Sequence, residues 1–476
     1  MRAGAWGLAG AAALVVVFSL VPVSAQSVNY EGFVVGERAA GMGGAYTALA
    51  DDGSAVFHNP AGLAQVRRSG LSMSANTYGY HESTVEGVLT GSGKSVDLER
   101  SGALAFPNSL VYVVPLGGED PVQHTAAFSV LVPDYFEEDG VQSLLLPEAG
   151  VEFDIFVATT RQVYLVGPSY GLRVGRLYVG ASLFARYLSY ARERSTVLNT
   201  RIEDYASRLQ QFEQVTADFV GLEGVLGVMV KPTPAWSFGL RVEVPPARLY
   251  GTARSFAART VVKAPGGRDF AAAEAEVYQD VFRDLEDDVY VHRPWAFSAG
   301  ASLTLAGGLV LSMDARLYLP LDPYRFIDGA PREATERYGE LPLGLDSPPR
   351  TWDSTRPDPG GELVVNGALG AFVPVTEGYA VMAGLYSDLS PVASDKVGDV
   401  ERVDQLGATF AVQREDEDAT LTLGLGAIYG WGEAFGLRFD GGQVAPSQPD
   451  VTRWTAMVFL AGSTPFGGDA EEVEAE

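Results

Sequence analysis

Cysteine is absent from the 476 residues, so disulfide bonds and thiolate metal ligands are excluded. Histidine is scarce, and the four present stand far apart, without the spacing of paired metal ligands: His58, His81, His124 and His292. No metal site or other cofactor is therefore predicted. Basic residues are few, 34 Lys and Arg against 60 Asp and Glu. The net charge of −26 argues against a nucleic-acid partner, because binding nucleic acid depends on neutralising its phosphates.

Long hydrophobic runs are also missing after residue 25, where no stretch has the roughly 18 consecutive apolar residues that a membrane helix requires. A membrane protein with this sequence must therefore be a β-barrel. The apolar run from Leu8 to Val23 follows Arg2 and precedes Ser24-Ala25. This order is typical of a cleaved secretory signal, so residues 1–25 are predicted to be a signal peptide. An uncleaved anchor is the alternative, but the run is short for a membrane span.

Residues 67–466 show the alternation of apolar and polar residues that barrel strands require. In 309–319, for example, Leu311 and Met313 alternate with Ser312 and Asp314. Fourteen strands are predicted, at 69–79, 100–115, 122–132, 162–173, 176–191, 217–231, 235–250, 293–305, 308–319, 362–374, 379–389, 402–414, 419–431 and 451–464. A soluble β-sandwich has the same period. An even strand number with alternating short and long connections instead favours an all-β, transmembrane antiparallel barrel.

The long connections are expected at one end of that barrel, at 133–161, 192–216, 251–292 and 320–361, the last as an irregular cap. In 202–212 and 277–285, apolar residues recur at helical spacing. They either pack within these loops or form an apolar groove that captures ligand. The candidate capture residues are Leu209, Phe212, Tyr278, Val281, Phe282 and Leu285.

Residues 36–66 are rich in small residues, which let backbones approach closely. Asp51-Asp52 before Gly53 predicts one turn, and Asn59-Pro60 predicts another, because the residue before proline avoids the helical region. Such a short, kinked segment suits a plug inside a narrow tube. Its hatch residues are expected to be Gly41, Gly43, Gly44, Asp51, Asp52, Asn59, Pro60 and Ala61.

The order of these features resembles the FadL family of outer-membrane transporters for long-chain fatty acids and other hydrophobic compounds. The resemblance is carried by Ala50-Asp51-Asp52, Asn59-Pro60-Ala61, Pro107-Asn108, Val111-Tyr112-Val113-Val114-Pro115 and Asp388-Leu389-Ser390-Pro391-Val392. It implies a monomeric barrel of about 14 strands in outer-membrane lipid, with residues 26–66 folded in the lumen as a gating hatch. It also implies passive, inward transport of a hydrophobic small molecule of the fatty acid class.

In that family the ligand leaves through a gap in the wall near a kinked third strand. Here Pro133 ends the predicted third strand, where it either helps to open such a gap or simply stops the strand. The chain departs from the usual aromatic C-terminus of outer-membrane barrels, because Phe466 is followed by residues 467–476, expected to be an acidic periplasmic tail.

Two other functions are weighed against transport. A non-transporting interaction protein, such as a secretion-system barrel, is the main alternative. An enzyme is suggested only by Gly167-Pro168-Ser169-Tyr170-Gly171, which fits G-x-S-x-G. A nucleophile elbow needs a helix after the strand, whereas a second strand pattern follows here, so no enzyme is predicted.

Overall fold

The computed structural model describes residues 29–465, except 33, 92, 118–121, 147–150, 203–204, 266–275, 340–350, 398–399 and 441–442. The predicted signal peptide, the first residues of the predicted hatch (26–28) and the acidic tail lie outside the described residues. Within this described part, no helix has the length and apolar character needed to cross a membrane.

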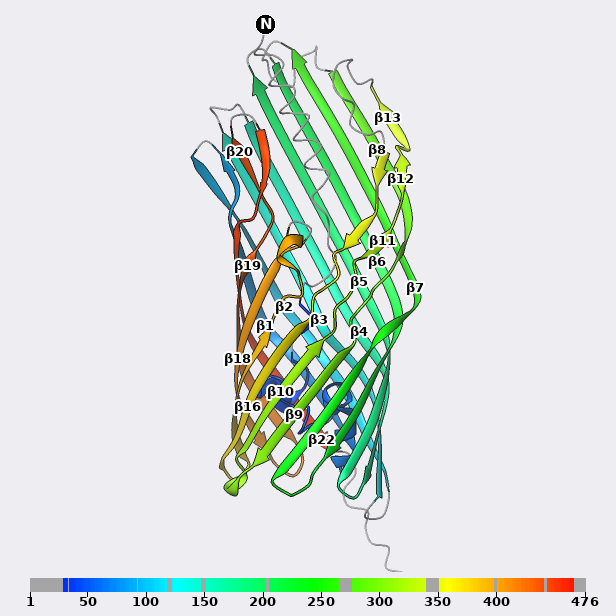
Figure 1. Cartoon of the computed structure of the whole chain (residues 1–476), viewed down its shortest axis with the longest axis vertical. Coiled ribbons are helices and arrows are strands. Elements are labelled where there is room, and N and C mark those ends of the chain that lie inside the picture. The colour runs from blue at the N-terminus through cyan, green and yellow to red at the C-terminus, as the bar shows by residue number, and fades with distance from the viewer. Residues whose placement is uncertain are drawn as a thin grey trace, which may run out of the picture.

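A ring of 14 antiparallel strands closes into a barrel (Figure 1). Each strand pairs with the next, and the last pairs with the first, so the ring has no free edge. In ring order the strands are β1 (Gly70–Gly91), β2 (Lys94–Gly117), β3 (Val122–Leu146), β4 (Val151–Val174), β5 (Leu177–Ile202), β6 (Tyr205–Val230), β7 (Trp236–Pro265), β9 (Ala296–Thr304), β10 (Val310–Tyr318), β16 (Val364–Thr376), β17 (Tyr379–Asp388), β18 (Arg402–Glu415), β19 (Thr420–Glu433) and β22 (Asp450–Pro465). All fourteen predicted strands are confirmed, in the predicted order.

The remaining elements are short, apart from β8, and lie between ring strands or before them. Inside the barrel are α2 (Glu37–Gly41), α3 (Ala55–His58) and the 3-10 helix η1 (Pro60–Gln65). Outside the ring are β8 (Glu276–Val289), β11 (Tyr324–Asp328), β12 (Pro331–Glu333), β13 (Glu336–Tyr338), β14 (Thr351–Asp353), β15 (Arg356–Asp358), β20 (Gly436–Asp440), β21 (Gln443–Ser447), η3 (Ala306–Gly308) and η4 (Ser394–Lys396). The predicted irregular cap at 320–361 therefore contains short strands.

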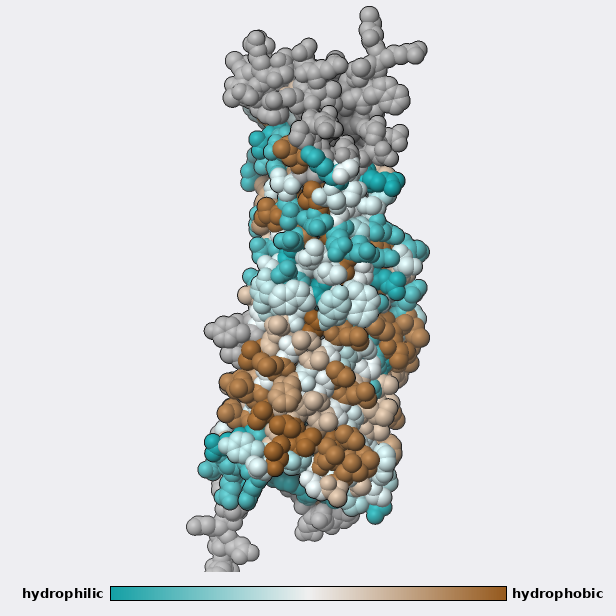
Figure 2. All heavy atoms as spheres, turned by 90° about the vertical axis from the view of Figure 1, so that its left-hand side faces the viewer, coloured by the Kyte–Doolittle hydropathy of each residue, from teal (hydrophilic) through white to brown (hydrophobic). Residues whose placement is uncertain are grey.

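The outward face of the barrel carries an apolar band, which covers the lower half of the face in Figure 2. Exposed aromatic side chains mark its two borders. Trp236 and Tyr379 begin β7 and β17 beside short turns, whereas Tyr429 lies opposite Trp454 further along the barrel. The two levels are separated by roughly ten residues of strand, the length with which a tilted strand crosses a bilayer. This is the surface of a membrane-spanning barrel.

Strands β3 to β7 continue far beyond that band and stand as a tall wall on one side of the barrel (Figure 1). Strands β5 and β6 have 26 residues each and β7 has 30. The predicted long loops at 133–161, 192–216 and 251–292 were therefore largely wrong, since strand fills most of them. The sequence misleads because the outer face of a strand meets water instead of lipid above the membrane, so the apolar alternation disappears.

The helical patterns were also wrong, because both segments are strands. In β8 a bulge places Leu285 opposite Ser255 but Phe282 opposite Ala257. One extra residue on β8 reverses the phase of the alternation, so two side chains three positions apart point to the same side, as in a helix. In 202–212 no bulge intervenes, and Leu209 and Phe212 lie on opposite faces of β6.

Candidate functional site: a plugged lumen

The plug, defined as residues 36–66, fills the lumen at the end with the short turns (Figure 1). Its glycines lie against the wall. A Cβ on Gly43 would lie 3.0 Å from the backbone of Gly384 on β17, and its φ of +62° also disfavours side chains. Equivalent atoms on Gly41 and Gly44 would meet Met382 at 2.9 Å and Arg316 at 2.7 Å. The small residues are thus required by close approach of the plug to the barrel.

The wall contributes its own glycines, which sequence reasoning missed. A Cβ on Gly227 would lie 2.0 Å from Asn59 Oδ1, and one on Gly239 would lie 2.1 Å from the carbonyl of Thr47. Others contact the plug in the same way: Gly180, Gly370 and Gly384. Their signal in the sequence is a glycine at a lumen-facing position of a strand, where a side chain would otherwise be expected.

Asn59, Pro60 and Ala61 form the predicted turn. The Asn59 side chain is fully buried, donates to the carbonyls of Thr47 at 2.7 Å and Val228 at 3.3 Å, and accepts from the Ala61 amide at 3.2 Å. Pro60 begins η1, where its missing N–H costs nothing. The side-chain amide of Asn59 therefore joins two parts of the plug to each other and to β6.

The acidic pair of the plug is bonded within the plug itself. Asp51 accepts from Arg38 at 2.5 Å and from the Tyr46 hydroxyl at 2.6 Å. Burial alone would raise the pKa of Asp51, but the Arg38 guanidinium and the Tyr46 hydroxyl hold it below its ordinary value. Asp52 accepts from the amide of Ser54 at 2.8 Å. The pair stabilises the turn that the sequence predicts.

Polar side chains of the wall form hydrogen bonds with backbone groups of the plug that are not paired in a β-ladder. Asp314 of β10 accepts from the amides of Tyr46 and Thr47, both at 2.9 Å. Ser182 and Ser237 donate to the carbonyls of Val56 at 2.7 Å and Ala48 at 2.6 Å. These residues were not singled out from the sequence, because a polar residue at a lumen position is ordinary in a barrel.

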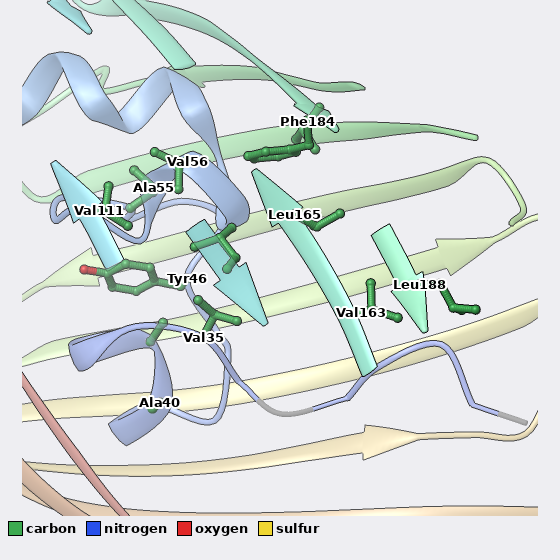
Figure 3. Close-up of a cluster of buried hydrophobic side chains, with 14 of the residues drawn as sticks. Val35, Ala40, Tyr46, Ala55, Val56, Val111, Val163, Leu165, Phe184 and Leu188 are labelled. Carbon is green, nitrogen blue, oxygen red and sulfur yellow. The ribbon is translucent and has the colours of Figure 1, made fainter. Parts of the chain in front are cut away.

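Apolar contacts between plug and wall add to these polar bonds. In Figure 3, Val35, Tyr46 and Val56 face Val111 and other barrel side chains. The buried cluster includes these residues and others from plug and wall: Met42, Leu49, Leu63, Val113, Leu131, Val163, Leu165, Phe184 and Leu188. Any movement of the plug must therefore separate apolar surfaces as well as polar bonds.

A cavity of about 70 Å³ lies above the plug, and eight of the twenty residues that line it carry a charged side chain. Arg186 pairs with Glu223 at 2.6 Å, and Arg241 with Glu243 at 3.0 Å. His58 projects from the plug and shares a hydrogen bond with the Val35 carbonyl at 2.8 Å, as expected for a buried histidine. Burial lowers the pKa of His58 to about 3, so this imidazole stays neutral. The cavity is more polar than an apolar ligand path predicts.

The wall beside this cavity is interrupted. Strands β2 and β3 pair from Ser109–Leu131 towards the short turn and again at Ser101–Asp139, but not between those points. Strand β3 continues across Pro133 with a bulge between Leu131 and Asp134, so the interpretation of Pro133 as a strand stop was wrong. Pro133 and Asp134 both line the cavity. The kink therefore places an opening in the ladder next to the plugged lumen.

The segment before the plug covers the inner side of this opening. A Cβ on Gly32 would lie 2.3 Å from the Pro133 carbonyl oxygen, and Asn108 donates to the Val34 carbonyl at 3.4 Å. Arg316 pairs with Glu31 and binds the Gly44 carbonyl. The N-terminal segment and the plug are thus linked through one arginine of β10.

The predicted capture residues do not form one open groove. Tyr278, Val281, Phe282 and Leu285 are all less than 9% exposed, and Phe282 packs with Trp352 between β8 and the cap. Leu209 belongs to a separate lumen cluster with Leu89, Phe153, Leu198 and Leu437. Phe212 instead contacts Phe256 on the outer side of the wall.

Ser169 lies inside β4, which runs on to Val174 with no turn or helix after the serine, as the strand pattern predicts. The Ser169 hydroxyl donates to Ser182 at 2.7 Å. Among the described residues, no group of three or more His, Asp or Glu side chains is placed to hold a metal ion.

No family model matches the chain, and no curated protein sequence matches it. Solved structures, by contrast, match the fold of the chain. A Pseudomonas aeruginosa FadL homologue aligns over 92% of this chain and 100% of its own, with a TM-score of 0.55 and 13% identity. The Pseudomonas putida toluene transporter TodX aligns over 92% and 99%, with a TM-score of 0.51 and 13% identity. The Ralstonia pickettii toluene transporter TbuX aligns over 93% and 100%, with a TM-score of 0.51 and 14% identity. With its plugged ring of 14 strands, the chain therefore has the fold of the FadL-family transporters.

Proposed function

We propose that the protein is a passive channel of the bacterial outer membrane that admits hydrophobic or amphipathic small molecules, long-chain fatty acids among them. The observation that carries this proposal is the interrupted β2–β3 ladder beside the plugged cavity. A water-filled pore would need neither feature, because small polar solutes diffuse straight through. A hydrophobic ligand, by contrast, lowers its free energy when it leaves the lumen laterally and enters the lipid.

The proposed path begins at the outer end of the lumen, beside the buried apolar cluster that contains Leu198 and Leu209. The ligand then moves down the lumen to the cavity above the plug. The hatch residues, including Asn59 and the glycines that touch the wall, act as the gate in this proposal. Movement of the plug draws the linked segment around Gly32 away from Pro133 and opens the gap.

Two further observations support the proposal. The apolar band with its aromatic borders fits a barrel in outer-membrane lipid. Two of the proteins with the same fold are described as toluene transporters. The tall polar wall instead suits the alternative, a protein that binds another protein at the cell surface.

The test is uptake by the purified barrel reconstituted in lipid vesicles. We expect dodecanoate to cross faster than in protein-free vesicles, whereas glucose does not, because the plug blocks a continuous aqueous path. If neither crosses and a second protein copurifies in a fixed ratio, the interaction role is correct and transport is not. Equal permeation of both solutes would identify an ordinary pore.

A further inference from the structure

Basic side chains gather around the end of the plug, on the side of the barrel that has the short turns. Arg67 and Arg68 follow the plug directly and are exposed. Gln65, two residues before Arg67, accepts a hydrogen bond from the Lys231 ammonium in the turn after β6. The Lys231 amide in turn donates to the carbonyl of Arg176, another exposed residue, at 3.0 Å. We call Arg67, Arg68, Arg176 and Lys231 the basic patch.

The basic patch lacks a counter-charge. None of its four side chains forms an ion pair with any residue that the structure describes. The Asp51 carboxylate of the plug is bound by Arg38 at 2.5 Å and by the Tyr46 hydroxyl at 2.6 Å. Neighbouring charges of one sign repel each other and attract ions of the opposite sign, so the patch favours an anionic partner.

The patch includes the link between plug and wall. The plug ends at residue 66 and β1 begins at Gly70, so Arg67 and Arg68 lie in the three residues that join them. An anionic partner bound to these arginines therefore restrains the link, and through it the plug.

The last strand of the ring ends beside this link. Pro465 of β22 is paired with Gly70 of β1, two residues after Arg68. The chain continues into residues 467–476, which carry no basic residue but five acidic ones: Asp469, Glu471, Glu472, Glu474 and Glu476. Because a chain advances at most about 3.6 Å per residue, Asp469 has a reach of about 14 Å from Pro465. The first of these carboxylates can thus meet the basic patch.

The other neighbour of β22 is acidic. Strand β22 also pairs with β19, and the turn before β19 exposes Asp416, Glu417 and Asp418. Of these, Asp416 is paired with Arg414 at 3.5 Å. An acidic segment that continues from β22 is therefore repelled on the β19 side and attracted on the β1 side.

We propose that the acidic segment 467–476 binds the basic patch of the same chain and restrains the link between plug and β1. A single exposed ion pair contributes little, but the carboxylates are tethered beside the patch, so the pairs reinforce one another. The inference goes beyond the proposed transport function and does not depend on it.

A protease that cleaves after glutamate tests the contact in the full-length barrel in detergent. Mass spectrometry follows cleavage at Glu471 and Glu472. At low salt we expect the double variant Arg67→Gln with Arg68→Gln to be cleaved several-fold faster than the native chain, because a bound segment is shielded from the protease. At high salt the native chain should be cleaved as fast as the variant, because salt screens exposed ion pairs.

Arg254→Gln with Arg325→Gln is the matched control, because it removes the same charge from side chains that are 73% and 63% exposed and lie outside the patch. Slower gel migration of the heated than of the unheated form shows that each variant has folded. The inference is overturned if the patch variant is cleaved at the native rate, or if the control is cleaved equally fast. Protection that disappears on dilution would also overturn it, since the segment would then bind a second copy.

The restraint on the link has its own measurement. A cysteine introduced at the buried Ser54 should react with a thiol reagent several-fold faster in a chain that lacks residues 467–476 than in the full-length chain. The patch variant with its acidic segment intact should react as fast as the shortened chain. Equal reaction in the full-length and shortened chains would show that the segment does not restrain the link.

Discussion

At the scale of single residues, contact between plug and wall depends on positions where no side chain fits. The sequence shows the glycines of the plug plainly, because they cluster within residues 36–66. It does not show which wall glycines matter, because Gly227 and Gly224 differ only in the face of β6 on which they lie. That difference depends on strand register, which a single sequence leaves open by a residue or more.

The substitution Gly227→Ala should displace the plug from its contact with the wall. Its new Cβ would lie 2.0 Å from Asn59 Oδ1, whose hydrogen bonds hold the turn at Pro60, and overpacking of this kind costs about 1–3 kcal/mol. Limited proteolysis should then cut within residues 36–66 faster than in the native protein. In Gly224→Ala the added Cβ meets Val244 at 3.8 Å, an ordinary contact, so this control should resist cleavage like the native chain.

Because of Glu37, the stability of the contact between plug and wall should depend on pH. Burial, with the nearby charge of Asp52, raises the pKa of Glu37 from 4.5 to about 8. The seated plug holds this proton more tightly than the released plug does. The resulting stabilisation is fully present below about pH 4.5 and is lost as the pH rises through about 8, a change on the order of a few kcal/mol at most.

The measurement is thiol labelling of a cysteine at the buried Ser54, relative to a cysteine at the exposed Thr376, at pH 6 and pH 9. The ratio should rise at pH 9. Glu37→Gln should give the same ratio at both values, because its side chain does not titrate. A rise that persists in Glu37→Gln would assign the effect to another group.

At the scale of elements, the sequence predicted the order of the ring strands but not their length above the membrane. Inside the band, one face meets lipid and the other the lumen, so residues 309–319 alternate clearly. Above it, the outer face meets water, so residues 192–216 lose this alternation and resemble a loop. In β8, a single bulge turns a strand pattern into an apparent helix.

The two predicted capture segments should therefore differ in function. Leu209→Asn places a polar group in the lumen cluster and should lower dodecanoate uptake several-fold. Phe282→Ala leaves a void between β8 and Trp352 and should cost about 3–5 kcal/mol locally. Hydrogen exchange in β8 should accelerate while uptake stays near native. If Phe282→Ala lost uptake and Leu209→Asn did not, β8 would be the segment that captures the ligand.

At the scale of the whole molecule, the sequence predicts the fold of the barrel better than the features of the proposed gate. Strand number, even count and short turns follow from composition and alternation, which is why the barrel could be predicted. The kink at Pro133 could not, because a proline at the end of an apolar run reads equally well as a stop. The charged cavity was missed as well, since its residues come from strands far apart in the sequence and meet only when the ring closes.

The central claim is that the plug must move for ligand to pass. A Cβ on Gly53 of the plug would lie 3.0 Å from Ser72 Cβ on β1, close to the Cβ separation of a disulfide, about 3.5–4.5 Å. In this cysteine-free chain, the double variant Gly53→Cys with Ser72→Cys therefore has one disulfide to form. Uptake of dodecanoate is measured before and after reduction, with each single variant as control. We predict that the oxidised barrel stays folded but loses uptake, and that reduction restores it. Equal uptake by the oxidised and reduced forms would show that the plug is static and that the ligand bypasses residues 36–66.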